Sequence, residues 1–221
     1  MPGAEHGSAY AINDAGTIIG DDSAGAALVW SSATAEPTSL PLPEGATAAT
    51  ATDIDEDGTV VGNIDQQRPY VWLADGTHRD LPLPTLDDGQ ATTGRVFAVR
   101  NGWATGWAST GGDEAASGRP AAGGDTVAVR WNLRTGETRT VAEFAGSPDS
   151  VNAQGWMVGL STEGRAVLVT DAGTVALPEL APHEPGQLTN IPGTVSDDGT
   201  LVTGQSDDAT DTIQPVVWRC E

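Results

Sequence analysis

Short apolar runs of four to six residues alternate with polar turns along the whole chain. The clearest stretch is residues 52–84, where Val60-Val61 and then residues 70–72 are β-branched or aromatic and are separated by polar positions. Asp57-Gly58 and Asp75-Gly76 are sequences typical of tight hairpin turns, because glycine takes positive φ without strain. The runs are too short for a helix that buries one face, so the stretch predicts four short antiparallel strands.

This pattern occurs five times in the chain. Each unit has a hairpin, a third run rich in Val, Ala and Trp, and, in most units, a leucine-containing fourth run. One glycine closes the second run of each unit: Gly20, Gly62, Gly106, Gly159 and Gly204. Consecutive members are 42, 44, 53 and 45 residues apart. Such a period, with four strands per unit, is typical of propeller blades.

The repeat therefore predicts an all-β fold, a single-domain five-bladed β-propeller over residues 1–221. The expected blades are about residues 8–43, 49–84, 95–141, 149–180 and 193–218. The Leu-Pro-Leu-Pro segments at 40–43 and 81–84 are predicted as fourth strands. Unit five stops after its third run, so the last blade is expected to have an open outer edge, which would suit a weak dimer contact.

Four of the seven tryptophans end the third run of their units: Trp30, Trp72, Trp131 and Trp218. We expect them to pack between neighbouring blades. The repeat itself, Ala-x-Ile-Asn-Asp-x-Gly-x-Ile/Val-Val-Gly followed by an apolar run ending in Trp, resembles the bacterial HAF repeat, a family described as an extracellular repeat. The resemblance extends over residues 8–218 and is clearest in units one, two and five.

Two units depart from that pattern. Unit three lacks one residue in its first hairpin, and unit four has Val169 where Trp is expected. The resemblance implies a propeller-like fold. It implies no activity, because the repeat is a structural consensus without shared catalytic residues.

The chain is strongly acidic, with 31 Asp and Glu against 10 basic residues, all Arg, and a net charge of −21. Such a surface repels nucleic acids and anionic membranes, so neither is expected as a partner. No stretch is long enough to cross a bilayer. Met1-Pro2-Gly3 begins no signal peptide, which predicts a cytoplasmic protein unless an extracellular leader has been removed. The single Cys220 cannot form a disulfide within the chain.

Loop length predicts the side of the molecule on which a site would lie. The turns inside the hairpins are uniformly short, whereas the connections at 84–94, 108–125, 181–194 and 205–214 are long. In a propeller these two sets of connections lie on opposite rims. Functional residues gather on loops held by a rigid scaffold, so we expect any site over the central channel on the long-loop rim.

Asp53, Asp55 and Asp57, followed by Gly58, match the start of a calcium-binding loop, in which alternate carboxylates surround the ion. The twelfth position is Ile64 rather than Glu, and the segment coincides with a hairpin. A simple hairpin turn is therefore the alternative. No other cofactor is expected.

Acidic and aromatic residues near the expected starts of the inner strands suggest two further kinds of site. The candidate catalytic residues are Tyr10, Asp53, Arg95, Asp149 and His183. Asp53 and Asp149 are expected to face each other across the channel as paired acid and base, and His183 is placed on the long-loop rim as a base. Solvated or turn-capping aspartates are the alternative.

The candidate ligand-binding residues are Phe97, Trp107 and Asn190. Trp107 leads into a long loop, where an exposed indole could stack on a sugar or an apolar molecule, although core packing is equally compatible with the sequence. The sequence thus predicts a binding module for a small molecule, a glycan or a protein, acting as a monomer or weak dimer. The alternative is a lyase, cyclase or hydrolase with acid and base residues at the channel mouth.

Overall fold

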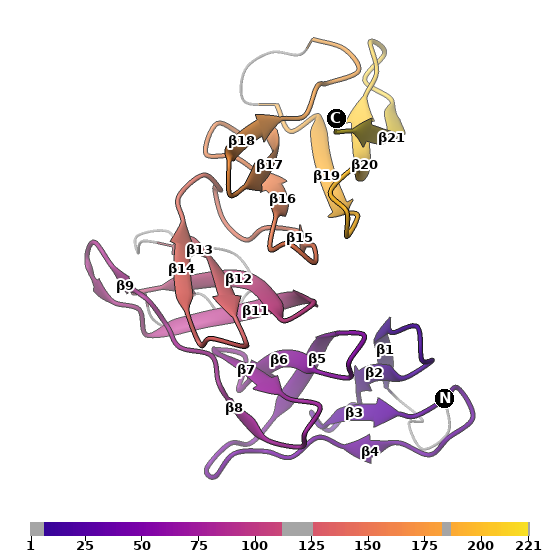
Figure 1. The fold of residues 1–221 in the computed structure, drawn as a ribbon, viewed down its shortest axis with the longest axis vertical. Helices are drawn as coiled ribbons and strands as arrows, with labels where there is room; N and C mark the ends of the chain where they lie inside the picture. Colours follow the sequence, from indigo (N-terminus) through magenta and orange to yellow (C-terminus); the bar gives the residue numbers. More distant parts are fainter. Residues whose placement is uncertain (1–6, 112–125, 183–186, 221) are drawn as a thin grey trace.

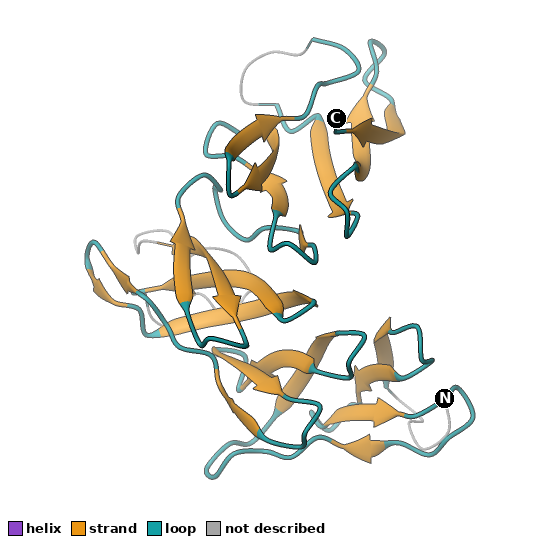
Figure 2. Ribbon diagram, in the orientation of Figure 1, coloured by secondary structure: helices purple, strands orange, loops and turns teal. Residues whose placement is uncertain are grey.

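The computed structural model describes residues 7–111, 126–182 and 187–220, all of them in strands and loops (Figure 1, Figure 2). Short β-branched runs between glycine turns form strands because their side chains fit a pleated, half-buried surface. Within these residues, the structure has no helix of the length and hydrophobicity that a membrane span requires.

Five antiparallel sheets, named sheets 1 to 5 in chain order, contain most of the strands. Sheet 1 is β1 (Ser8–Ile12), β2 (Ile18–Asp21), β3 (Ala27–Trp30) and β4 (Thr38–Ser39). Sheet 2 is β5 (Ala49–Ile54), β6 (Val60–Ile64), β7 (Arg68–Trp72) and β8 (His78–Asp80). Sheet 3 is β11 (Thr93–Arg100), β12 (Trp103–Ser109), β13 (Thr126–Asn132) and β14 (Thr138–Val141).

Sheet 4 is β15 (Ser150–Val151), β16 (Met157–Leu160), β17 (Ala166–Thr170) and β18 (Gly173–Ala176). Sheet 5 has three strands, β19 (Asn190–Val195), β20 (Leu201–Asp207) and β21 (Ile213–Arg219). A small hairpin of β9 (Thr85–Leu86) and β10 (Gly89–Gln90) connects sheets 2 and 3. The strand order follows the chain in every sheet, so the repeated up-and-down units that the sequence predicts are present.

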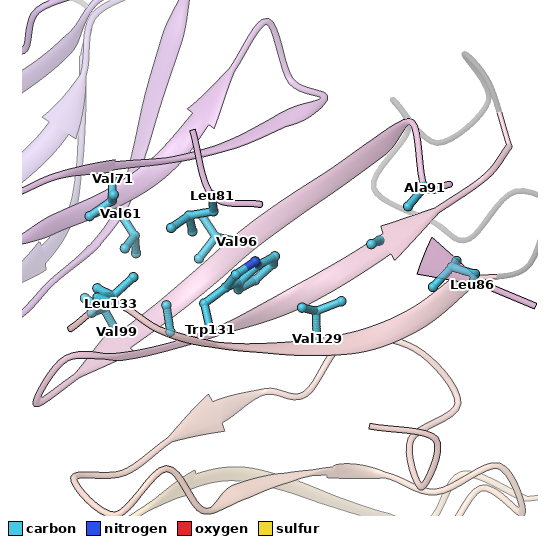
Figure 3. Packing of buried hydrophobic residues seen from close by; sticks show 12 residues of the cluster. Val61, Val71, Leu81, Leu86, Ala91, Val96, Val99, Val129, Trp131 and Leu133 are labelled. Atoms are coloured by element: carbon cyan, nitrogen blue, oxygen red, sulfur yellow. The ribbon is translucent and has the colours of Figure 1, made fainter. Parts of the chain in front are cut away.

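Consecutive sheets pack face to face around an arc, with sheets 1 and 5 at its two ends (Figure 1). Each interface is a separate hydrophobic cluster. For example, Val61 and Val71 of sheet 2 pack with Val96 and Trp131 of sheet 3 (Figure 3). Equivalent clusters join sheets 1 and 2, sheets 3 and 4, and sheets 4 and 5. The core is therefore a series of small inter-sheet cores.

The repeated glycines lie opposite β-bulges in the inner strands. In sheet 2 the pairing of β5 with β6 shifts between Ala51 and Asp53, and the bulge brings the Thr50 carbonyl close to Gly62. A Cβ at Gly62 would collide with that oxygen. The same bulge is found in sheets 1, 3 and 5. The glycine periodicity thus records a close backbone approach in these four units. In sheet 4 the pairing has no bulge, and a Cβ at Gly159 would instead be 3.0 Å from the Phe144 side chain.

Three tryptophans bind the preceding sheet through their indole N–H as well as their rings. Nε1 of Trp72 donates to the Pro41 carbonyl at 2.8 Å, and Nε1 of Trp131 donates to the Pro82 carbonyl at 2.7 Å. Trp218 makes the equivalent bond to Pro178 at 2.8 Å. The prediction of packing between neighbouring units is confirmed for these three. Within the described residues it is wrong for Trp30, which packs against Ile18 and Leu28 of its own sheet.

The expected fourth strands were placed too late in the chain. β4 and β8 end at Ser39 and Asp80, before the Leu-Pro-Leu-Pro segments. Leu40 and Leu81 each donate one more ladder hydrogen bond, to Ala27 and Pro69. The ladder then ends, because the prolines that follow have no N–H to donate. Their carbonyls remain available for the tryptophans of the next sheet.

Sheet 5 has the open outer edge that the sequence predicts. No strand in the described part of the chain pairs with the outer side of β21. On this strand Ile213 is 61% exposed and Val217 is 59% exposed, whereas Trp218 on the opposite face is buried against sheet 4.

We predict that Gly62→Ala lowers the free energy of unfolding by about 1–3 kcal/mol, because the new methyl group displaces the bulged strand β5. Chemical denaturation would measure the loss. Gly193→Ala is the matched control, since a Cβ there would be 3.6 Å from the nearest atom, the Thr203 carbonyl oxygen. Equal stability of the two variants would contradict the role assigned to the bulge.

Candidate functional site: the channel between the inner strands

The first strand of every sheet contributes to one central cavity of about 310 Å³. Its wall includes residues of all five sheets: Ile12, Asp53, Arg100, Ser150 and Asp197. These residues lie at or near the hairpin ends of their strands, so we call this space the hairpin-side cavity. The five inner strands therefore surround a common channel.

A second cavity, of about 430 Å³, lies among the inner strands of sheets 1 to 3, towards their long-loop ends. We call it the loop-side cavity. It is lined by Tyr10, Thr50, Ala51, Thr52, Arg95 and Phe97. Three of the residues singled out from the sequence, Tyr10, Arg95 and Phe97, thus meet on the rim that the loop lengths indicate.

Hydrogen bonds connect the hairpin turns of successive sheets. Asn13 Nδ2 donates to the Asp55 carbonyl, linking sheets 1 and 2. The Asp55 carboxylate accepts the backbone N–H of Asn101 at 3.0 Å and of Gly102 at 2.9 Å, linking sheets 2 and 3. Asn101 and Asn152 continue the series by donating to the carbonyls of Ala153 and Ser196. This series holds the hairpin ends of the inner strands in place.

Arg100 crosses the channel beneath the hairpin-side cavity. Its Nη2 and Nε donate to the Asp197 carboxylate of sheet 5 at 2.6 and 2.9 Å, and its Nη1 donates to Glu56 of sheet 2 at 2.6 Å. The Arg100 guanidinium lowers the pKa of Asp197. The Asp14 N–H and then Arg100 lower the pKa of Glu56. These bonds link sheet 5 to sheets 2 and 3, which are not its neighbours in the chain.

The calcium-loop aspartates are not gathered around a common point. The Asp53 carboxylate accepts N–H bonds from Ile54 and Val99, Asp55 binds the next hairpin, and Asp57 accepts the Thr59 N–H within its own turn. The described residues contain no group of three His, Cys, Asp or Glu side chains that could hold a metal ion. Hairpin formation, the alternative interpretation of this segment, explains the Asp57 contact, whereas Asp53 and Asp55 also accept backbone N–H groups of sheet 3.

Asp53 lies at the opposite end of the channel from the one expected. It is the fifth residue of β5, beside the hairpin, because β5 begins at Ala49 rather than at the polar residues that follow. Asp53 lines the hairpin-side cavity with Ser150, whereas Asp149 does not line it. The expectation that Asp53 and Asp149 form a facing pair over the long-loop rim is not supported by these positions.

The carboxyl groups of both aspartates nevertheless have raised pKa values. Burial raises the pKa of Asp53 to about 6, against the opposite effect of the Val99 and Ile54 N–H groups. Asp149 is an exposed residue, but desolvation by its surroundings also raises the pKa of its carboxyl to about 6. Each group can therefore exchange a proton close to neutral pH.

In the loop-side cavity, Arg95 lies beside Phe97, with 5.7 Å between its guanidinium carbon and the ring centre. Burial lowers the pKa of Arg95. The Tyr10 hydroxyl donates to Asp21 at 2.9 Å, and burial, followed by this bond, raises the pKa of Tyr10. The cavity thus combines one cation, an aromatic ring and hydroxyl groups.

Two candidate ligand-binding residues are buried. Trp107 is 3% exposed and pairs with Arg95 and Ala128 in the middle of sheet 3. Of the two alternatives for this residue, core packing is therefore right and the exposed indole is wrong. Asn190 is 2% exposed and donates to the Leu177 carbonyl at 2.9 Å. His183 lies outside the described residues.

Two features of the channel were not predicted from the sequence. The first feature is Arg100. It occupies the position in unit three that is taken by the turn-capping Asn13 and Asp55 in units one and two, and this departure from the repeat was the only sign of its role in the sequence. The second feature is Thr50, which lies in a run of Ala and Thr that carries little strand pattern. The hydroxyl of Thr50 is buried beside Arg95 in the loop-side cavity.

No known protein family matches the chain's sequence, and no curated protein is similar to it. Solved structures do share its fold. Virginiamycin B lyase from Staphylococcus aureus superposes with a TM-score of 0.51 at 13% identity, covering 94% of this chain and 69% of the lyase. A protein assigned as a gluconolactonase gives 0.52 at 11% identity, with coverages of 96% and 75%.

TolB from Acinetobacter baumannii gives a TM-score of 0.50 at 13% identity, covering 95% of this chain and 50% of TolB. These three neighbours are β-propellers. The fold is propeller-like. At 11–13% identity the likeness concerns the fold alone.

We predict that the protein becomes more stable as the pH falls from 7 to 5. Asp53 and Asp149, with pKa values of about 6, are protonated in the folded state at pH values where the unfolded chain is still ionised. The gain should be roughly 1–2 kcal/mol, which denaturant titrations at each pH would measure. Asp149→Asn should reduce the gain, and the exposed control Asp171→Asn should not. A decrease in stability over this range would contradict the assignment.

We further predict that Arg100→Met destabilises the protein by about 1 kcal/mol and increases hydrogen exchange in the sheet 5 hairpin, residues 195–202. The effect should shrink in ~1 M salt, because these ion pairs are half exposed. Arg139→Met is the control, since Arg139 pairs with Glu137 two residues away. Unchanged exchange in the hairpin would exclude a cross-channel role for Arg100.

Proposed function

We propose that this protein is a ligand-binding β-propeller, a ring of five blades whose site is the loop-side cavity of the central channel. The observation that supports this proposal best is the convergence of Tyr10, Thr50, Arg95 and Phe97 from three sheets on one cavity. Pockets that combine an apolar wall with a few polar groups are typical small-molecule sites. The ligand would enter from the long-loop rim. It would be a small molecule, a sugar of a glycan or a group from a protein partner.

The architecture is consistent with this function. Each sheet contacts its neighbours through a complete hydrophobic cluster, so the inner strands are rigid supports for side chains that face the channel. The resemblance of the units to HAF repeats belongs to the same proposal, and it brings no catalytic residue with it. The proposal also includes weak dimer formation through the open edge of β21.

An enzyme is the second candidate, and the acidity of Asp53 and Asp149 is the observation that favours it. A pKa of about 6 suits a general acid or base at neutral pH. Two of the structural neighbours are named as a lyase and a gluconolactonase. Under this alternative Asp53, the one of the two that lines the hairpin-side cavity, would take part in a lyase, cyclase or hydrolase step there.

Native mass spectrometry of the gently purified protein, before and after EDTA, tests the binding proposal. We expect an organic mass that EDTA does not remove and that Phe97→Trp displaces, because the larger ring fills the loop-side cavity. Val217→Trp, on the exposed face of β21, is the matched control and should retain the mass. Retention of the mass by Phe97→Trp would place the ligand elsewhere. A bare chain that also shows no thermal shift with a metabolite library would contradict the proposal.

The same preparation separates the two candidates. Asp53→Asn and Asp149→Asn should leave the retained mass unchanged if the protein only binds its ligand. If the protein is an enzyme, the two variants should instead retain an unconverted substrate of different mass, or lose turnover in an activity screen while remaining folded.

A further inference from the structure

Arg95 differs from the other arginines in the described chain. Seven of them donate to an acceptor: Arg68, Arg79, Arg100, Arg130, Arg134, Arg139 and Arg165. The guanidinium of Arg95 has no hydrogen bond or ion pair with any described residue, and its Nε is completely buried. Arg219 also lacks a partner within that part of the chain, but it is exposed, where water can solvate it.

A second unsatisfied group lies in the same cavity. The Thr50 hydroxyl oxygen is buried and has no hydrogen-bond partner among the described residues. Both residues line the loop-side cavity. Buried polar groups in folded proteins are normally satisfied. Because the Arg95 Nε and the Thr50 oxygen are closed to solvent, a ligand in the cavity would reach Arg95 through the rest of its half-buried guanidinium.

The chain has many carboxylates that could neutralise the charge of Arg95. It contains 31 acidic residues, and Asp21 is close enough to the cavity to accept the hydroxyl of Tyr10. None of these carboxylates contacts Arg95 in the described structure. The missing partner is therefore an acceptor, and the guanidinium selects a negatively charged one.

We propose that the loop-side cavity binds a small organic monocarboxylate with a flat apolar body. Its carboxylate accepts hydrogen bonds from the Arg95 guanidinium, and its body lies against the Phe97 ring and the Ala51 side chain. This inference rests on the proposed function and specifies the ligand class of the same site.

The number of charges on the ligand follows from the surroundings of Arg95. Arg95 is the only cation that lines the cavity, so it compensates one negative charge. The net charge of −21 repels ligands that carry more. The Phe97 ring favours a planar group. The Tyr10 and Thr52 hydroxyls, which donate to Asp21 and to the carbonyls of Val61 and Val96, can accept a hydrogen bond at its edges.

Benzoate is a suitable probe, with benzamide as its uncharged analogue of the same shape and inorganic phosphate as an anion without an apolar body. Backbone amide NMR should show benzoate shifting the signals of Thr50, Ala51 and Phe97, with a Kd of roughly 1 mM or lower. Benzamide should bind at least ~10-fold more weakly, and phosphate should not compete.

Arg95→Met should weaken benzoate binding at least ~10-fold, and Arg95→Lys, which keeps the charge but not the planar fork, should have an intermediate effect. Arg219→Met, a control with the same change at an exposed position, should bind as the parent protein does. Unchanged amide signals outside the cavity would verify that each variant is folded.

Two results would overturn the inference in different ways. If benzamide binds as well as benzoate, or if Arg95→Met binds benzoate normally, the ligand class is wrong while the channel site stands. If neither compound shifts the signals of the cavity residues, and the native protein also carries no organic mass, both the ligand class and the proposed function fail.

Discussion

The hydrogen bonds between consecutive hairpin turns are the constraint on which the channel depends. Each sheet could slide or tilt on its hydrophobic neighbour, because apolar packing has little directional preference. The bonds from Asn13 to Asp55, from Asn101 and Gly102 to Asp55, and from Asn152 to Ser196 fix the height of each hairpin relative to the next. They therefore fix which residues of the inner strands meet across the channel.

Part of the acidic composition is explained by turns. Asp57, Asp75, Asp198 and Asp208 each accept the backbone N–H of a threonine two residues later. Contacts with the threonine lower the pKa of Asp208 to about 2. Many of the negative charges thus satisfy backbone donors at hairpins, and the number of acidic residues says little about a cation site.

The fold was more predictable from the sequence than the site. Gly62 and Trp131 belong to residue patterns that recur along the chain, because the backbone constraints that they meet recur in most units. These patterns could therefore be recognised in the sequence. Asp53 was misplaced, because the alanines and threonines that begin β5 lack a strand signature. Trp107 could not be assigned to the core or to the surface from the sequence, because its burial in the centre of sheet 3 depends on how the neighbouring strands pair.

The contacts of Arg100 have a consequence for how such a chain can evolve. The interfaces between sheets are local, so duplicating one unit would leave each of them intact and only widen the ring. The bridge from Arg100 to Asp197, which spans 97 residues of sequence, would not survive that insertion. Arg100 is thus a link that depends on the spacing between particular units, whereas the local interfaces do not.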